Sequence, residues 1–176
     1  MHNIKLIFTF HSEVGNYNSL SLFNVISSIN PDIIFEELPW HYHEMAYKFR
    51  GSIAVEIDAI KMYLEYKVID HIPVDTYKRS NTYHRKEEEL CKAISNVIDI
   101  VDATELKVFT EDHLKLIGQH GLPFLNSNEN MLMFNRRLGL EHDILKQIND
   151  DRLLQFELER KEVIDKREHE IINNIY

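Results

Sequence analysis

Cysteine is almost absent from the sequence, since Cys91 is the only one. A single thiol cannot form a disulfide within the chain, and it lacks the further cysteines of a thiolate metal site. We therefore expect a reducing compartment and a cytoplasmic location. The apolar, helical surroundings of Cys91 favour a buried core thiol over a catalytic nucleophile.

Positive charge is also scarce. The 20 lysines and arginines face 29 aspartates and glutamates, which gives a net charge of −9. Binding to a phosphate backbone needs a basic face, so this balance argues against a nucleic-acid partner. Carboxylates are better suited to divalent cations.

Long hydrophobic runs are missing. The first apolar run covers about seven residues, which is too short for a membrane-spanning helix, and no small-residue cleavage site follows it. No internal repeat or low-complexity linker divides the 176 residues. We expect a single domain, 1–176, with no membrane association, in which an α/β half (1–78) precedes a helical half (79–176).

Several catalytic motifs are absent as well. The sequence contains no glycine-rich phosphate loop and no GxSxG, CxxC or HExxH motif. These absences argue against nucleotide-dependent enzymes, serine hydrolases of the GxSxG type and common zinc proteases.

The most informative stretch is 4–38, which predicts a strand, a helix and a second strand. Strand-forming residues run from Ile4 to Phe10 and end at His11, and apolar residues at helical spacing follow from Leu20 to Ile29. Asn30 and Pro31 end that helix, and a short apolar strand leads to Glu36 and Glu37. Continuous apolar strands around a helix predict a βαβ unit of a parallel sheet.

A third predicted strand completes a small, mostly parallel sheet. The expected strands cover about residues 3–11, 32–37 and 67–75, and the fold class is α/β. Ligands collect at the carboxyl ends of parallel strands, where His11, Glu37 and Asp75 are expected to meet. We predict these three as catalytic residues because they occur together, although each taken alone is more typical of a solvated strand end or a turn.

Helices are predicted between and after the strands. Residues 40–49 indicate a short helix or an ordered loop, and Ile53, Ile57, Ile60 and Leu64 form the apolar stripe of a helix that ends near Tyr66. The basic, polar residues 78–86 are expected to form a solvated loop. Further helices are predicted at 87–101, 104–118, 128–138 and 141–176.

The order of these segments resembles the TraB/Tiki superfamily (TraB/PrgY, ChaN-like and erythromycin-esterase-like proteins). The segments are a strand ending in His11, then PDIIFEEL (31–38), EIDAIKMYLEYKV (56–68) and IPVDTY (72–77). By this resemblance His11 matches the histidine of a GxxH motif, Glu37 the glutamate of a PDxxxxEL-like signature, and Asp75 the third-strand aspartate. REHEII from Arg167 is similar to an arginine-containing helix of the family.

Two features depart from the family pattern. Phe8 stands where the motif has glycine, and the second GxxH strand that usually follows is missing from the sequence. The resemblance covers about the first 75 residues and, more weakly, the end of the chain. It implies an α/β hydrolase, metal-dependent in several relatives, that acts on an ester or peptide-like bond of a small-molecule or peptide substrate.

A divalent metal ion of unknown identity is the expected cofactor. His11 and Glu37 are its predicted ligands, and Glu13 is a third candidate if 11–13 is extended. Glu36 points to the opposite face of its strand from Glu37. His41 and His43 are a rival pair of metal ligands if their segment is a strand, because their side chains then share a face. On a helix the two side chains diverge, and Pro39 just before them favours a helix.

A non-catalytic function is the alternative. In that hypothesis the chain is a shortened relative that acts as a binding or oligomerisation module. The charged last helix, with its sparse apolar seam, would then form a homodimer.

Overall fold

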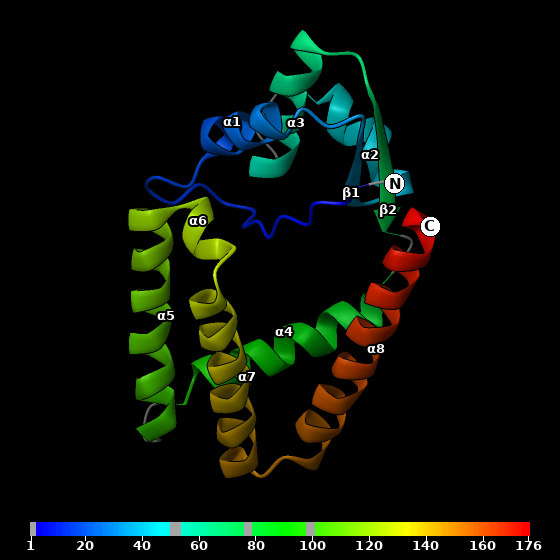
Figure 1. The fold of residues 1–176 in the computed structure, drawn as a ribbon. Coiled ribbons are helices and arrows are strands. Elements are labelled where there is room, and N and C mark those ends of the chain that lie inside the picture. The colour runs from blue at the N-terminus through cyan, green and yellow to red at the C-terminus, as the bar shows by residue number, and fades with distance from the viewer. Residues whose placement is uncertain (1–2, 50–53, 76–78, 98–100) are drawn as a thin grey trace. The chain divides into compact units, whose positions relative to one another are not determined.

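The computed structural model describes residues 3–49, 54–75, 79–97 and 101–176. These ranges are mainly helical and contain a two-stranded parallel sheet (Figure 1). The chain divides into two compact units. Unit 1 comprises Met1–Ile34, Glu44–His71 and Glu111–Phe134, and unit 2 comprises Phe35–His43, Ile72–Thr110 and Asn135–Tyr176.

Unit 1 is built around two helices that pack against each other, α1 (Ser19–Ile29) and α3 (Val55–Tyr66). The short α6 (Leu122–Leu125) and parts of α5 (Val101–His120) and α7 (Asn128–Ile148) add to its core. The buried residues are Tyr17, Leu22, Ile26, Val55, Ala59, Ile60, Tyr63, Ile117, Leu122, Phe124 and Leu125. Both α1 and α3 were predicted from their apolar spacing, although Ile53 lies outside the described residues.

Helix α1 begins and ends as its sequence predicts. Asn18 and Ser21 form a reciprocal capping box, in which each side chain accepts a hydrogen bond from the backbone N–H of the other. Asn30 takes the left-handed conformation with φ of 50° and closes the last turn by donating its N–H to the carbonyl of Ile26. Pro31 follows directly, so the helix cannot continue.

The predicted first strand, 3–11, is wrong. Residues 3–10 form neither a helix nor a strand. Side chains satisfy part of this backbone: the Asn126 amide exchanges two hydrogen bonds with the N–H and carbonyl of Phe8, and the N–H of Phe10 donates to the Tyr17 hydroxyl. Because these partners replace a strand neighbour, the segment stays outside the sheet.

The loop after this segment makes a close backbone contact with α5. Gly15 has φ of +53°, and a Cβ built on it would lie 2.4 Å from the carbonyl oxygen of Gly118. The N–H of Asn16 donates to that same oxygen at 2.8 Å. Glycine is therefore required at position 15 for two reasons, its conformation and its lack of a side chain.

The sheet contains β1 (Ile33–Pro39) and β2 (Asp70–Asp75), which are parallel neighbours. The helices between them along the chain are α2 (Trp40–Lys48) and α3. The expected small parallel sheet with a helical second half is thus confirmed in outline. It has two strands among the described residues rather than three.

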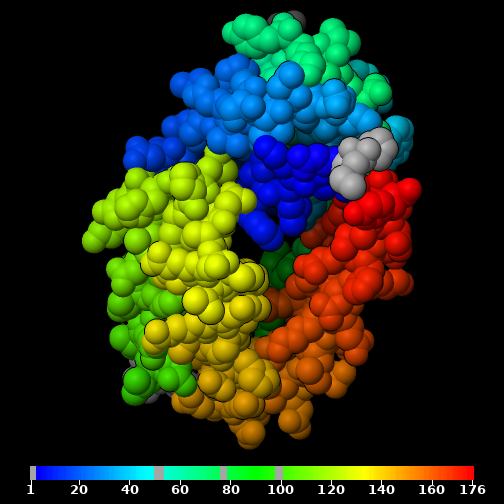
Figure 2. Space-filling view, viewed as in Figure 1, coloured from blue at the N-terminus to red at the C-terminus, as the bar shows by residue number. Residues whose placement is uncertain are grey.

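Unit 2 contains α4 (Asn81–Ser95) and α8 (Asp151–Ile175), which pack together, and parts of α5 and α7. Leu90, Leu145 and Phe156 form its buried cluster. Much of α8, coloured orange to red, is at the surface in Figure 2. Residues 81–86 are helical and not the predicted loop, because Ser80 caps α4 by accepting a hydrogen bond from the N–H of Tyr83.

Cys91 is exposed on α4, so the prediction of a buried thiol is wrong. Its neighbour Leu90 is completely buried. Successive helical residues point about 100° apart, and the core takes up the Leu90 side of the helix.

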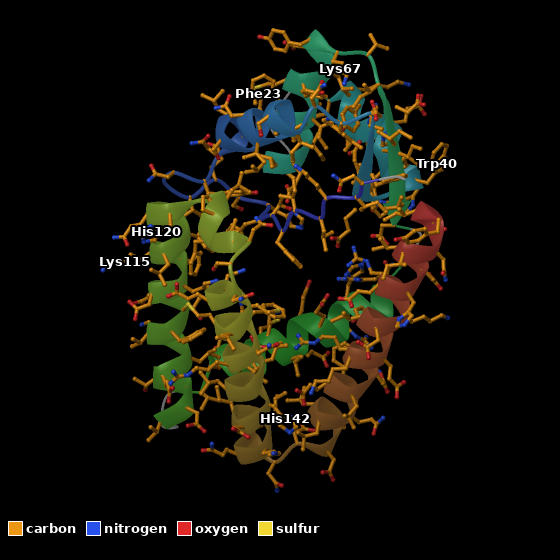
Figure 3. The ribbon with its side chains drawn as sticks, viewed as in Figure 1. Phe23, Trp40, Lys67, Lys115, His120 and His142 are labelled. Atoms are coloured by element: carbon orange, nitrogen blue, oxygen red, sulfur yellow. The ribbon has the colours of Figure 1, made fainter. Side chains whose placement is uncertain are left out.

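Two buried glutamates join α7 to α8 in unit 2. Glu157 accepts a hydrogen bond from His142 at 2.7 Å and lies 3.3 Å from the Lys161 ammonium group. Glu141 contacts both Arg137 and Arg160. His142, labelled in Figure 3, belongs to the later part of α7. Each buried carboxylate is paired, as burial of a charge requires.

The contact at Gly15 generates the first prediction. The Gly15→Ala variant should lose at least about 2 kcal/mol of unfolding free energy, because the new methyl group meets the carbonyl of Gly118 in a left-handed conformation. Gly139→Ala is the matched control, since nothing lies within 4 Å of a Cβ there. It should gain about 0.5–1 kcal/mol as an interior helical position. Urea unfolding measures both, and equal effects would contradict the described contact.

A second prediction concerns the acid stability of unit 2. Burial raises the pKa of Glu157, but hydrogen bonds from His142 and Lys161 outweigh it, so the pKa is lowered. A carboxyl with a lowered folded-state pKa stabilises the fold above its unfolded value, about 4.3, and loses this effect as pH falls through the folded value.

The Glu157→Gln variant should therefore be less stable than wild type by on the order of 1–3 kcal/mol at pH 6, and the difference should shrink at pH 3. Urea unfolding of both proteins at the two pH values tests this. A difference that does not change with pH would show that the charge of Glu157 is not stabilising.

Candidate functional site

Three charged side chains converge in unit 2, where β1 and β2 approach their carboxyl ends. Arg167 of α8 donates from Nε and Nη2 to the two oxygens of Asp75, at 3.1 and 2.9 Å. Its Nη2 also donates to Oε1 of Glu37 at 2.5 Å. We call these three residues the Arg167 cluster. It brings together two of the predicted catalytic residues.

The three members differ in exposure. The side chain of Asp75 is 6% exposed and that of Arg167 is 18% exposed, whereas that of Glu37 is 63% exposed. The Asp75–Arg167 pair is thus an internal ion pair with two parallel hydrogen bonds, a geometry that only arginine provides. Glu37 is the member most accessible to solvent.

The environment of Arg167 stabilises its positive charge. Burial lowers its pKa, but hydrogen bonds and charge from Asp75 and Glu37 outweigh this effect and raise the pKa. A second contact holds the end of α8 in place, since the Asn174 amide donates to the carbonyl of Val74 at 2.8 Å. Helix α8 therefore fixes the guanidinium against the last residue of β2.

Arg167 keeps donor groups for a further ligand. Its Nε and Nη2 are used by the two carboxylates, and Nη1 donates to no side chain or carbonyl in the ranges that the structure describes. A guanidinium has five N–H donors, of which two belong to Nη1. The cluster can thus receive an additional oxygen atom.

His11 lies in unit 1, beside Glu56 in the first turn of α3. Its Nδ1 is 3.0 Å from Oε1 of Glu56, and its carbonyl accepts a hydrogen bond from the N–H of Val55. The ring is 85% exposed. Burial raises the pKa of Glu56, but hydrogen bonds from His11 and Thr9 contribute to lowering it overall. A carboxylate that holds one ring nitrogen is a common way to orient a functional imidazole.

Glu13 interacts with the start of α1. Its Oε1 accepts hydrogen bonds from the N–H and the hydroxyl of Ser19, at 3.2 and 2.9 Å. A carboxylate near the first turn of a helix is stabilised by the unpaired N–H groups there. Glu13 thus has a structural role in unit 1, and its predicted role as a metal ligand stays a prediction.

Glu36 and His43 form a separate pair in unit 2. The Glu36 side chain is 4% exposed and its Oε1 lies 3.7 Å from Nε2 of His43. Residues 40–43 are helical, so His41 and His43 diverge as predicted for that case. His71 of β2 packs its ring against Tyr47 in unit 1, with 4.5 Å between ring centroids.

Two residues of these contacts were not predicted as site residues. Arg167 stands at the start of REHEII, the segment that resembles the arginine-containing helix of the TraB/Tiki superfamily, but the resemblance gave it no role. Glu56 carried no signal, because an acidic residue in the first turn of a helix is ordinary.

Comparisons of the chain with family models, with curated proteins and with solved structures found no match. The resemblance to the TraB/Tiki superfamily therefore rests on the motif residues. No helix in the described ranges has both the length and the apolar composition to cross a membrane.

Removing Arg167 should destabilise the protein far more than removing Glu37. Arg167→Ala leaves the buried Asp75 carboxylate without its guanidinium and should cost about 3–5 kcal/mol. Glu37→Ala removes an exposed partner and should cost about 1 kcal/mol or less. Chemical unfolding of both variants measures the difference. Similar losses would mean that Asp75 and Arg167 do not form the buried pair.

Proposed function

We propose that the protein is a hydrolase that acts on an ester or peptide-like bond, with the Arg167 cluster as its catalytic centre. One observation supports this most. Glu37, Asp75 and Arg167 are separated by 38 and 92 residues, and each belongs to a segment that resembles the TraB/Tiki superfamily. Their meeting in one place is what a shared active site requires.

In this proposal Arg167 binds the carbonyl oxygen of the substrate. Its Nη1 donors take the oxygen that becomes negatively charged when the carbonyl carbon is attacked. Fixed donors aimed at such an oxygen stabilise the transition state more than the substrate. The raised pKa of Arg167 keeps the positive charge present across the pH range of most enzymes.

Glu37 is the proposed general base. Its exposed carboxylate removes a proton from a water molecule as the water oxygen attacks the carbonyl carbon. When the tetrahedral intermediate collapses, the bond to the leaving alcohol or amine breaks and Glu37 returns the proton to the leaving group. The contact with Arg167 keeps this base beside the group that binds the oxyanion.

Asp75 is a positioning residue in this scheme. It accepts two hydrogen bonds from Arg167 and holds the guanidinium plane, so that the direction of Nη1 is determined before substrate binds. Preorganisation of this kind removes the cost of reorienting a charged group during the reaction.

The metal dependence implied by the resemblance is part of the proposal. Glu37 fits as a ligand, because it is an exposed carboxylate, whereas both oxygens of Asp75 already accept hydrogen bonds from Arg167. A bound divalent ion would supply a water molecule of lowered pKa. The roles of His11 and Glu13 in ion binding, and homodimer formation through α8, stay predictions.

Activity on a panel of p-nitrophenyl esters and fluorogenic peptides tests the hydrolase proposal. The Glu37→Gln variant should lower kcat by about 100- to 10,000-fold, because glutamine cannot accept the proton. Arg167→Lys should also lower kcat strongly, since lysine cannot make the paired hydrogen bonds.

Two exposed positions provide matched controls. Glu162→Gln and Arg152→Lys repeat the same chemical changes elsewhere on α8 and should leave kcat within about twofold of wild type, as expected of surface substitutions. A wild-type protein inactive on the whole panel, or an active Glu37→Gln variant, would contradict the proposal. In that case the binding-module alternative is preferred, and sedimentation measures whether the chain dimerises.

A further inference from the structure

A second group of chemically active side chains lies on the opposite face of β1 from Glu37. Glu36 is buried there, and His43 of α2 faces its carboxylate with only a fifth of its side chain exposed. The proposed hydrolase mechanism uses neither residue. The proximity of this buried carboxylate and this imidazole therefore needs an explanation of its own.

The local chain path places the two residues together. Strand β1 ends at Pro39 and α2 begins at the next residue, Trp40, so no loop separates strand from helix. The strand puts Glu36 on one face and the first turn of the helix returns His43 to that face. The pair is therefore formed within eight consecutive residues.

The distance within the pair suits two ligands of one ion. The Oε1 and Nε2 atoms are 3.7 Å apart, which is too far for a hydrogen bond between them. Zinc binds nitrogen and carboxylate oxygen at about 2.0–2.2 Å in tetrahedral geometry, which places two donor atoms roughly 3.4 Å apart. Both residues offer an atom that binds metals.

The surroundings favour a borderline transition metal over magnesium or calcium. Imidazole together with carboxylate is a donor set that suits zinc, whereas magnesium and calcium prefer oxygen alone. The indole of Trp40 stacks on the His43 ring with 6° between planes and 6.3 Å between centroids, which helps to orient the ring. Figure 3 labels Trp40 at this position.

We infer that Glu36 and His43 are ligands of a zinc-type divalent ion, at a site distinct from the Arg167 cluster. This inference goes beyond the proposed function and does not depend on it. The ion neutralises the buried carboxylate of Glu36 and fixes the junction of β1 and α2. Water or other side chains fill its remaining coordination positions.

Calorimetric titration of the tag-free protein with Zn²⁺ tests the inference. A histidine tag must be absent because it binds the same ion. Wild type should bind Zn²⁺, and the Kd should rise at least tenfold in Glu36→Gln and in His43→Ala. Mutating a residue that only hydrogen-bonds to a metal ligand typically costs about 10- to 100-fold in affinity, and losing a ligand itself should cost at least as much.

Two neighbouring residues serve as controls. His41→Ala removes a histidine from the same helical turn, about 200° around the helix from His43, and should change the Kd by less than twofold. Glu44→Gln removes an exposed carboxylate of α2, whose side chain is 79% exposed beside Lys48, and should also leave Zn²⁺ binding unchanged. Circular dichroism of each variant shows whether it is folded.

Cobalt adds a readout that does not depend on affinity. Co²⁺-loaded wild type should show the visible absorption of a tetrahedral site, and the His43→Ala spectrum should differ. The inference would be overturned if wild type did not bind Zn²⁺, or if Glu36→Gln and His43→Ala bound it as tightly as wild type does. Loss of binding in Glu37→Gln alone would also overturn it and would place the ion at the Arg167 cluster, so the two proposals fail separately.

Discussion

The pairing of Arg167 with Asp75 is the interaction on which unit 2 depends most. A carboxylate at the end of β2 is buried, and burial of a lone charge costs more than most folds can lose. The guanidinium from α8 compensates for this cost with two parallel hydrogen bonds. Helix α8 is thereby held to the strand by a contact whose geometry is specific as well as favourable.

The same contact links stability to chemistry. Its two hydrogen bonds use one edge of the guanidinium, and a third bond reaches Glu37, so the orientation of Arg167 is determined by the fold itself. A catalytic group that is placed in this way needs no reorganisation when a substrate arrives. The buried glutamates between α7 and α8 keep further charge inside unit 2 through equally specific partners.

The sequence allowed the helices to be predicted better than the first strand. Helical spacing from Leu20 to Ile29 and the stop at Asn30 and Pro31 located α1, because these signals are local. Residues 3–10 have strand composition, but their backbone partners are Asn126 and Tyr17, and one of these is more than a hundred residues away. No local pattern reveals such a partner.

The site was predictable in part for a similar reason. Glu37 and Asp75 were found from their positions near strand ends, and the structure joins them through Arg167. His11 belongs to unit 1, where its ring lies beside Glu56 and the predicted strand does not form, so its meeting with Glu37 and Asp75 stays a prediction. The spatial neighbours of a residue could be predicted only where the strand that carries it was itself predicted correctly.

The adjacent residues Glu36 and Glu37 have different environments because strand side chains alternate. Inserting or deleting one residue early in β1 would exchange their places, burying the exposed carboxylate and exposing the buried one. A change in the number of residues in this strand should therefore be more damaging than an exchange among its apolar residues.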